Sequence, residues 1–182
     1  MRIAIVMVAA MLGAAWAQEI KMPPAFDKLA AKAQETVDVT LDSNMLQLAG
    51  KFLSDKDADQ AKARKIIAGL KGITVRSFEF AKEGEYSMTD ADALREQLKA
   101  PGWSRIVNVT SKDENTEIYL RQAEGSQIGG MVVINAEPKE LTIVSLSGTI
   151  SVDDLSALAG QFGIPEAVEK AVPSKNKGKE EE

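Results

Sequence analysis

The hydrophobic pattern of residues 127–162 predicts two long strands, a tight turn and a helix. The strands read QIGGMVVINA and LTIVSLSGTI, and the segment EPKE between them carries Pro138, whose fixed φ suits the second position of a turn. The two strands are therefore expected to be adjacent and antiparallel. A helix is expected over residues 151–162, because Ser151 and Asp154 form a capping-box pattern before apolar residues at helical spacing.

Both strands of this hairpin are expected to be covered on two faces, because neither alternates cleanly between apolar and polar residues. If Ile134 and Ile143 line the core, four apolar side chains point the other way. Left exposed, they would form a patch of roughly a few hundred Å², which is large enough for an interaction site. This candidate partner surface consists of Met131, Val133, Val144 and Leu146. The alternatives are cover by Phe26 and Leu29 of an N-terminal helix, or by a second copy of the protein.

The rest of the pattern predicts helices between the early strands, followed by a run of strands. Helices are expected at 22–35, 43–53, 58–70 and 89–98, and strands at 36–41 and 73–80. In the first strand Val37, Val39 and Leu41 are expected to point inward, and in the second helix Met45, Leu48, Ala49 and Phe52 share one face. The segments RIVNVTS and TEIYLRQ then precede the hairpin, which makes a meander of four antiparallel strands.

These elements predict one α+β domain over residues 18–172. Its antiparallel sheet is expected to have about five or six strands, with helices packed mainly on one face. The charged tail at 173–182 has no apolar residue except Pro173, and it is expected to be disordered.

The N-terminus has the pattern of a secretory signal peptide over residues 1–17. Arg2 precedes a short apolar run, and Ala15-Trp16-Ala17 matches a cleavage site. The run is too short for an ordinary membrane span, so no span is expected after cleavage. No cysteine follows the site, and we expect a periplasmic or extracellular protein without a lipid anchor.

The composition excludes several kinds of chemistry. The chain has no histidine and no cysteine, which rules out Ser-His-Asp catalysis, thiol catalysis and ordinary zinc sites. No catalytic, metal-binding or cofactor-binding residue is assigned, and no cofactor is expected. A net charge of −5 argues against a nucleic-acid partner or an anionic membrane surface.

Two charged clusters have a structural and a functional interpretation. Asp55, Asp57 and Asp59 alternate as in a calcium loop, but that loop requires Gly and Glu where Gln60 and Ile66 stand. An acidic first turn of a helix is the favoured interpretation. A cluster of basic residues is interpreted either as a solvated face or as a docking patch for an acidic partner: Lys51, Lys56, Lys62, Arg64, Lys65 and Lys71.

Four segments carry a resemblance to a known family. They read VDVTLDSNMLQLAGKFL, IAGLKGITVRSFEF, PGWSRIV and, most specifically, AEPKELTIVSLSGTISVDDLSALAGQFGIP. With these segments the chain resembles the secreted bacterial family described as domain of unknown function 4252. The resemblance implies an exported α+β domain with no assigned chemistry, and no functional residue comes with it. Members in related lineages are often lipid-anchored, but this chain lacks the required cysteine.

The favoured hypothesis is a non-catalytic binding or interaction domain, for instance in an envelope-sensing system. Its partner would be a protein or an apolar ligand, and a homodimer is one form it could take. One alternative is a carrier with an apolar cavity between sheet and helices. The other is a hydrolase that uses only Ser, Lys and carboxylates, such as a glycosidase-like carboxylate pair.

Overall fold

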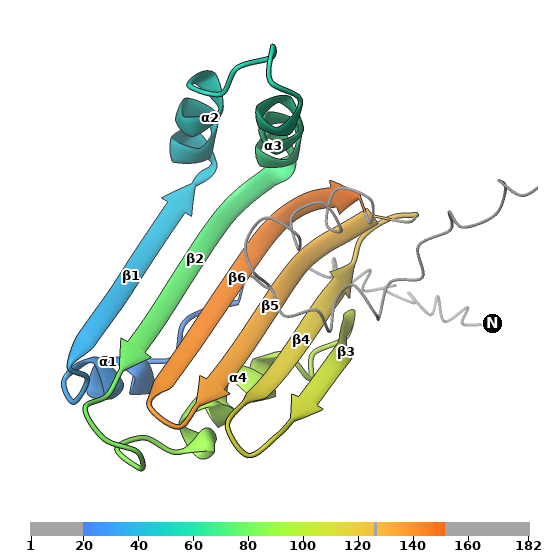
Figure 1. Ribbon diagram of the computed structural model, residues 1–182. Coiled ribbons are helices and arrows are strands. Elements are labelled where there is room, and N and C mark those ends of the chain that lie inside the picture. Colours follow the sequence, from blue (N-terminus) through green and yellow to red (C-terminus); the bar gives the residue numbers. More distant parts are fainter. Residues whose placement is uncertain (1–19, 126, 152–182) are drawn as a thin grey trace, which may run out of the picture.

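The computed structural model describes residues 20–125 and 127–151 of the 182-residue chain (Figure 1). The expected signal peptide, the charged tail and the helix expected after the hairpin lie outside the described residues, except that Ser151 is the last residue of a strand.

One six-stranded sheet contains all the strands of the described residues, in the order β1-β2-β6-β5-β4-β3. Every neighbouring pair is antiparallel. The last four strands in the sequence form the expected meander, and Pro138 lies in the tight turn between β5 and β6. The strands are β1 (Glu35–Asp42), β2 (Leu70–Glu79), β3 (Trp103–Thr110), β4 (Asn115–Gln122), β5 (Gln127–Glu137) and β6 (Glu140–Ser151).

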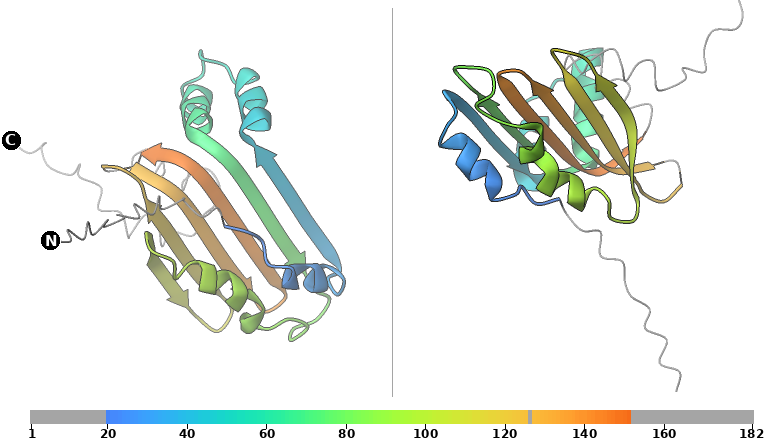
Figure 2. Two further views of the ribbon diagram at one scale, coloured as in Figure 1. Left: turned by 180° about the vertical axis from the view of Figure 1, so that it is seen from behind. Right: turned by 90° about the horizontal axis from the view of Figure 1, so that it is seen from below.

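The helices fall into two groups. On one face of the sheet, here called the first face, lie α1 (Ala25–Ala30), the 3₁₀ turn η1 (Met88–Ala91) and α4 (Asp92–Gln97) (Figure 2). The pair α2 (Ser43–Lys51) and α3 (Ala58–Gly69) connects β1 to β2 and projects beyond the end of the sheet (Figure 1). We call residues 43–69 the α2–α3 lobe. Among the described helices, none is long and apolar enough to cross a membrane.

Side-chain caps fix where the helices of the lobe begin. The Asp42 carboxylate accepts a hydrogen bond from the Met45 amide at 2.9 Å. The Asp57 carboxylate accepts two, from the amides of Asp59 and Gln60, each at 3.0 Å. Both caps satisfy amides that have no partner within their helix, so Asp57 has a structural role at the start of α3.

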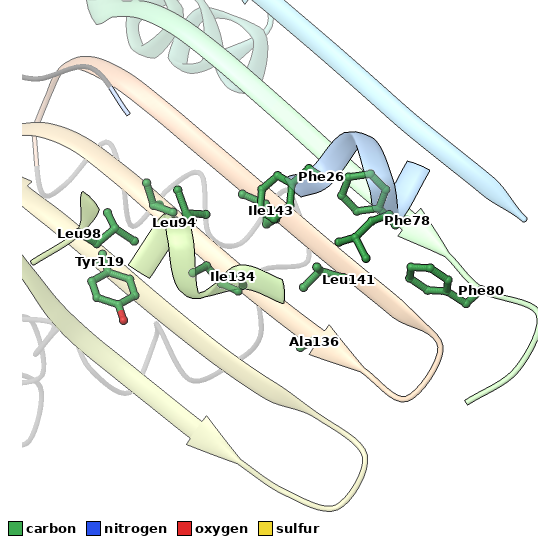
Figure 3. Close-up of a cluster of buried hydrophobic side chains, with 13 residues drawn as sticks. Phe26, Phe78, Phe80, Leu94, Leu98, Tyr119, Ile134, Ala136, Leu141 and Ile143 are labelled. Atoms are coloured by element: carbon green, nitrogen blue, oxygen red, sulfur yellow. The ribbon is translucent and has the colours of Figure 1, made fainter. Parts of the chain in front are cut away.

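The core of the first face forms between the sheet and α1, η1 and α4 (Figure 3). Phe26 of α1 packs against Phe78 of β2, with ring centroids 5.8 Å apart. Ile134 and Ile143 of the hairpin are fully buried here, as expected. Each such side chain contributes about 1.5–3 kcal/mol when it leaves water. The buried cluster is Phe26, Leu29, Phe78, Phe80, Ala91, Leu94, Leu98, Tyr119, Val132, Ile134, Ala136, Leu141 and Ile143.

The prediction that Val37 and Val39 point into the core is wrong. Both are exposed, because β1 is an edge strand and α1 packs on the opposite face. On that face Arg76 of β2 forms ion pairs with Asp38 of β1 at 2.9 Å and with Asp27 of α1 at 3.7 Å. The alternation along β1 identified which residues share a face but not which face is covered.

The start of β2 passes very close to β6 at two glycines. A Cβ atom on Gly148, whose φ is +141°, would lie 2.6 Å from the Leu70 Cα and closer still to the Gly69 carbonyl oxygen. A Cβ on Gly69 would collide with the carbonyl oxygen of Thr149. The absence of a side chain at both positions therefore allows β2 to enter the sheet beside β6.

We predict that Gly148→Ala lowers the free energy of unfolding by about 3–5 kcal/mol, because backbone strain adds to a steric collision. Gly84→Ala is the matched control: its φ is +80°, but a Cβ there meets nothing within 4 Å. This control should lose only about 1–2 kcal/mol. Urea unfolding measures both variants, and equal losses would show that the close approach is unimportant.

Candidate functional site

We call the face of the sheet opposite α1 and α4 the second face. On it, side chains of similar polarity form rows that run across the strands. Two apolar rows of cross-strand neighbours cross it. A third row is polar in the middle strands, and a fourth consists of glutamates. The first row is Leu41, Ile73, Leu146, Met131 and Leu120; the second is Val39, Val75, Val144, Val133, Ile118 and Val107; the third contains Ser77, Thr142, Asn135 and Thr116; the fourth is Glu35, Glu79, Glu140 and Glu137.

The four residues of the candidate partner surface lie together in the two apolar rows. Met131 is only 3 % exposed, Val133 and Leu146 are also buried, and Val144 is half-buried. They belong to a second core cluster, which includes Leu46 of α2. The alternative of cover by Phe26 and Leu29 is wrong, because both side chains lie in the core of the first face.

The third row, which is polar, lies between the two apolar rows and the row of glutamates. The Ser77 and Thr142 hydroxyls lie 2.8 Å apart, and both donate to the Glu140 carboxylate, at 2.9 and 2.7 Å. The Thr116 hydroxyl lies 2.8 Å from the Asn135 amide oxygen. These hydroxyls donate to a carboxylate or to an amide oxygen, so the row presents polar atoms that already have partners.

The most exposed large apolar side chains of the described residues lie on α2. Phe52 is 81 % exposed, Met45 51 % and Leu48 48 %. These three side chains, spaced by three and four residues, form one stripe along the helix, which we call the α2 stripe. The sequence correctly groups them on one face, but that face points to solvent.

The packing of α2 against α3 explains this orientation. Leu46 and Gly50 are the buried residues of α2. A Cβ on Gly50 would lie 3.8 Å from the Ile67 side chain and 3.9 Å from that of Arg64. The small Gly50 side therefore faces α3, and the larger apolar side chains face away. A contact made by a glycine leaves no hydrophobic signal in the sequence, so the pattern alone could not show it.

Five of the six residues of the basic cluster lie in the same lobe, and Lys71 follows it at the start of β2. All six side chains of the cluster are exposed, and Arg64 forms an ion pair with Asp55 at 2.6 Å. With Asp57 capping α3, two of the three aspartates of the expected acidic turn have partners within the lobe. Among the described residues, no group of three or more carboxylates is arranged to hold a metal ion.

The buried carboxylate of Glu117, on the first face, is the strongest candidate for carboxylate chemistry. It accepts hydrogen bonds from the Tyr119 hydroxyl at 2.6 Å and from Arg95 Nε at 2.8 Å, and Arg105 lies 3.4 Å away. Burial by itself would raise the pKa of Glu117, but these hydrogen bonds and the Arg95 charge together lower it. A general acid needs a raised pKa, so this carboxylate anchors α4 to the sheet and is poorly suited to proton donation.

Tyr86 lies at an open hollow of about 440 Å³ at the turns of the β3–β4 and β5–β6 hairpins. Its hydroxyl lies within hydrogen-bond distance of the carbonyl oxygens of Glu137 and Glu140. Burial and the charges of these two glutamates raise the pKa of Tyr86 to about 12. The phenol therefore stays protonated at neutral pH and helps to hold the β5–β6 turn.

The comparisons identify a family and nothing more specific. A family model described as "Domain of unknown function (DUF4252)" matches residues 29–158, which is more than half of the chain. Comparison with curated proteins and with solved structures gives no match.

We predict that Glu117→Gln lowers the free energy of unfolding by about 2–4 kcal/mol near neutral pH, because it leaves Arg95 without its buried counter-charge. Folding lowers the pKa of Glu117. The ionised carboxylate therefore stabilises the fold fully at pH values above its pKa in the unfolded chain, which is about 4.3. This stabilisation is lost as the pH falls through the lower pKa of the folded protein. The difference between wild type and variant should therefore shrink from about pH 7 to about pH 3.

The matched control is Glu96→Gln, which removes an exposed carboxylate paired with Lys99 at 2.5 Å. It should change the stability by less than about 1 kcal/mol. Urea unfolding at the two pH values provides the measurement. A loss for Glu117→Gln that is the same at both would contradict the proposed ion-pair role.

Proposed function

The chain belongs to the family described as a domain of unknown function (DUF4252), and we propose that it is an exported, non-catalytic binding domain that docks through the α2 stripe. The observation that carries this proposal is the exposure of Met45, Leu48 and Phe52 on one side of a single helix. A surface helix normally turns its apolar stripe to the core, and an apolar surface left in water often marks an interaction site.

The surroundings of the stripe support a role outside folding. The other side of α2 already packs against α3 at Gly50, and Leu46 belongs to the second core cluster. The large side chains of the sheet pack in two buried clusters, one on each face. The stripe is therefore not required for the core. The candidate surface at Met131, Val133, Val144 and Leu146 is largely buried, so it offers little exposed apolar area to a partner.

The hydrolase alternative has less support. Its best carboxylate, Glu117, is engaged by two arginines and a tyrosine, and its pKa is lowered. The hollow at Tyr86 is lined mainly by polar side chains of exposed turns, which also gives little support to an apolar-ligand carrier.

Export predicts a mature N-terminus at or near Gln18, because residues 1–17 have the pattern of a cleaved signal peptide. Intact mass spectrometry of the protein recovered from the exporting cell measures this directly. A soluble protein that retains Met1 would contradict the export part of the proposal, and it would leave the test of the docking surface unaffected.

The docking surface predicts position-specific crosslinking. A photoreactive amino acid placed at Leu48 or at Phe52 should give an adduct in the exporting cell, because both side chains would face the bound surface. The control positions are Ile106 and Lys112, which are also exposed but lie on β3 and in the β3–β4 turn. Folded protein without adducts at positions 48 and 52, or with equal adducts at the controls, would contradict a binding role for α2.

A further inference from the structure

We propose that the surface bound by the α2 stripe is an anionic lipid surface, with Met45, Leu48 and Phe52 inserted at the boundary between headgroups and acyl chains. This inference rests on the proposed function, and it adds the chemistry of the binding partner. It is based on three observations: the shape of the lobe, its charge, and the position of its most exposed side chain.

The shape of the lobe is suited to binding a flat or deformable surface. The lobe projects beyond the end of the sheet (Figure 1), and Phe52, at the C-terminal end of α2, is its most exposed large apolar side chain. Side chains that protrude in this way need a complementary groove on a protein partner. A lipid interface instead accepts an amphipathic helix that lies along it, without such a groove.

The charge of the lobe is opposite to that of the chain as a whole. Residues 43–69 contain five Lys or Arg and three Asp, for a net charge of +2, whereas the entire chain has −5. Asp55 pairs with Arg64 and Asp57 caps α3, while all five basic side chains are exposed. Basic residues beside an apolar helical stripe are attracted by anionic headgroups.

The same charges argue against other partners. Two copies that paired through their lobes would bring two positive surfaces together, which is unfavourable. A nucleic acid would satisfy the basic residues but would leave the Met, Leu and Phe side chains without apolar contacts. An anionic lipid surface offers contacts to both features of the lobe, the apolar stripe of α2 and the exposed basic residues.

The test uses the protein purified in its exported form and flotation with vesicles. Vesicles of phosphatidylcholine with phosphatidylglycerol should carry the protein upward, whereas pure phosphatidylcholine should bind it weakly. High salt should release most of the bound protein. The double variant Leu48→Gln with Phe52→Ser should reduce binding about tenfold or more, because it removes the inserted side chains.

Matched variants separate the lobe from the rest of the surface. Lys56→Gln with Lys62→Gln should weaken binding to anionic vesicles about fivefold or more and should leave binding to neutral vesicles unchanged. Ile106→Gln and Lys112→Gln make the same kinds of change far from the lobe and should bind as wild type does. Thermal melting should show that all the lobe variants remain folded, since the replaced side chains are exposed.

The outcomes distinguish the two proposals. Vesicle binding that is absent, insensitive to salt or unchanged in the lobe variants overturns the lipid surface. If adducts at positions 48 and 52 then contain a protein, the binding domain stands with a protein partner. If neither vesicles nor adducts are found, both proposals fail.

Discussion

The central hairpin is apolar on both faces, and the arrangement of the whole structure follows from keeping water away from both. Ile134 and Ile143 point to one side of β5 and β6, and Met131 and Leu146 to the other. Strands of this kind are unsuited to an edge of the sheet, where little protein surrounds them. The hairpin accordingly occupies the centre, with β2 and β4 on its two sides. The more polar strands β1 and β3 form the edges, and the first face is covered by α1, η1 and α4.

Local features of the sequence were sufficient for much of this architecture. Pro138 identified the tight turn, and the turn together with the strand pattern identified the meander. The pairing of β2 with β6 was beyond such reasoning, because it joins strands that are distant in the sequence. It depends on the close backbone approach at Gly69 and Gly148, and in a sequence those residues resemble ordinary loop glycines.

The orientation of β1, which was predicted wrongly, and that of α2, which was not predicted, share one physical cause. Periodicity shows which side chains lie on the same side of a strand or helix, but it does not show what lies opposite that side. The valines of β1 and the α2 stripe were both grouped correctly, and both face solvent. In α2 the deciding contact is made by Gly50. Likewise, the ion pairs of Glu117 bring together Arg95 and Arg105 from separate elements, and no spacing in the chain indicates them.

The connection between β1 and β2 has a consequence for how this protein can diversify. Asp42 and Gly72 are paired across the two strands, so the lobe is an insertion into a hairpin whose register is set without it. Long insertions between paired strands add little to the entropy of closing a loop. The lobe can therefore be shortened, exchanged or grafted between relatives while the sheet remains intact, provided that Leu46 keeps its place in the second core cluster and Gly69 keeps its close approach to β6. Selection can then change the proposed docking surface of the lobe while the sheet that holds it stays intact.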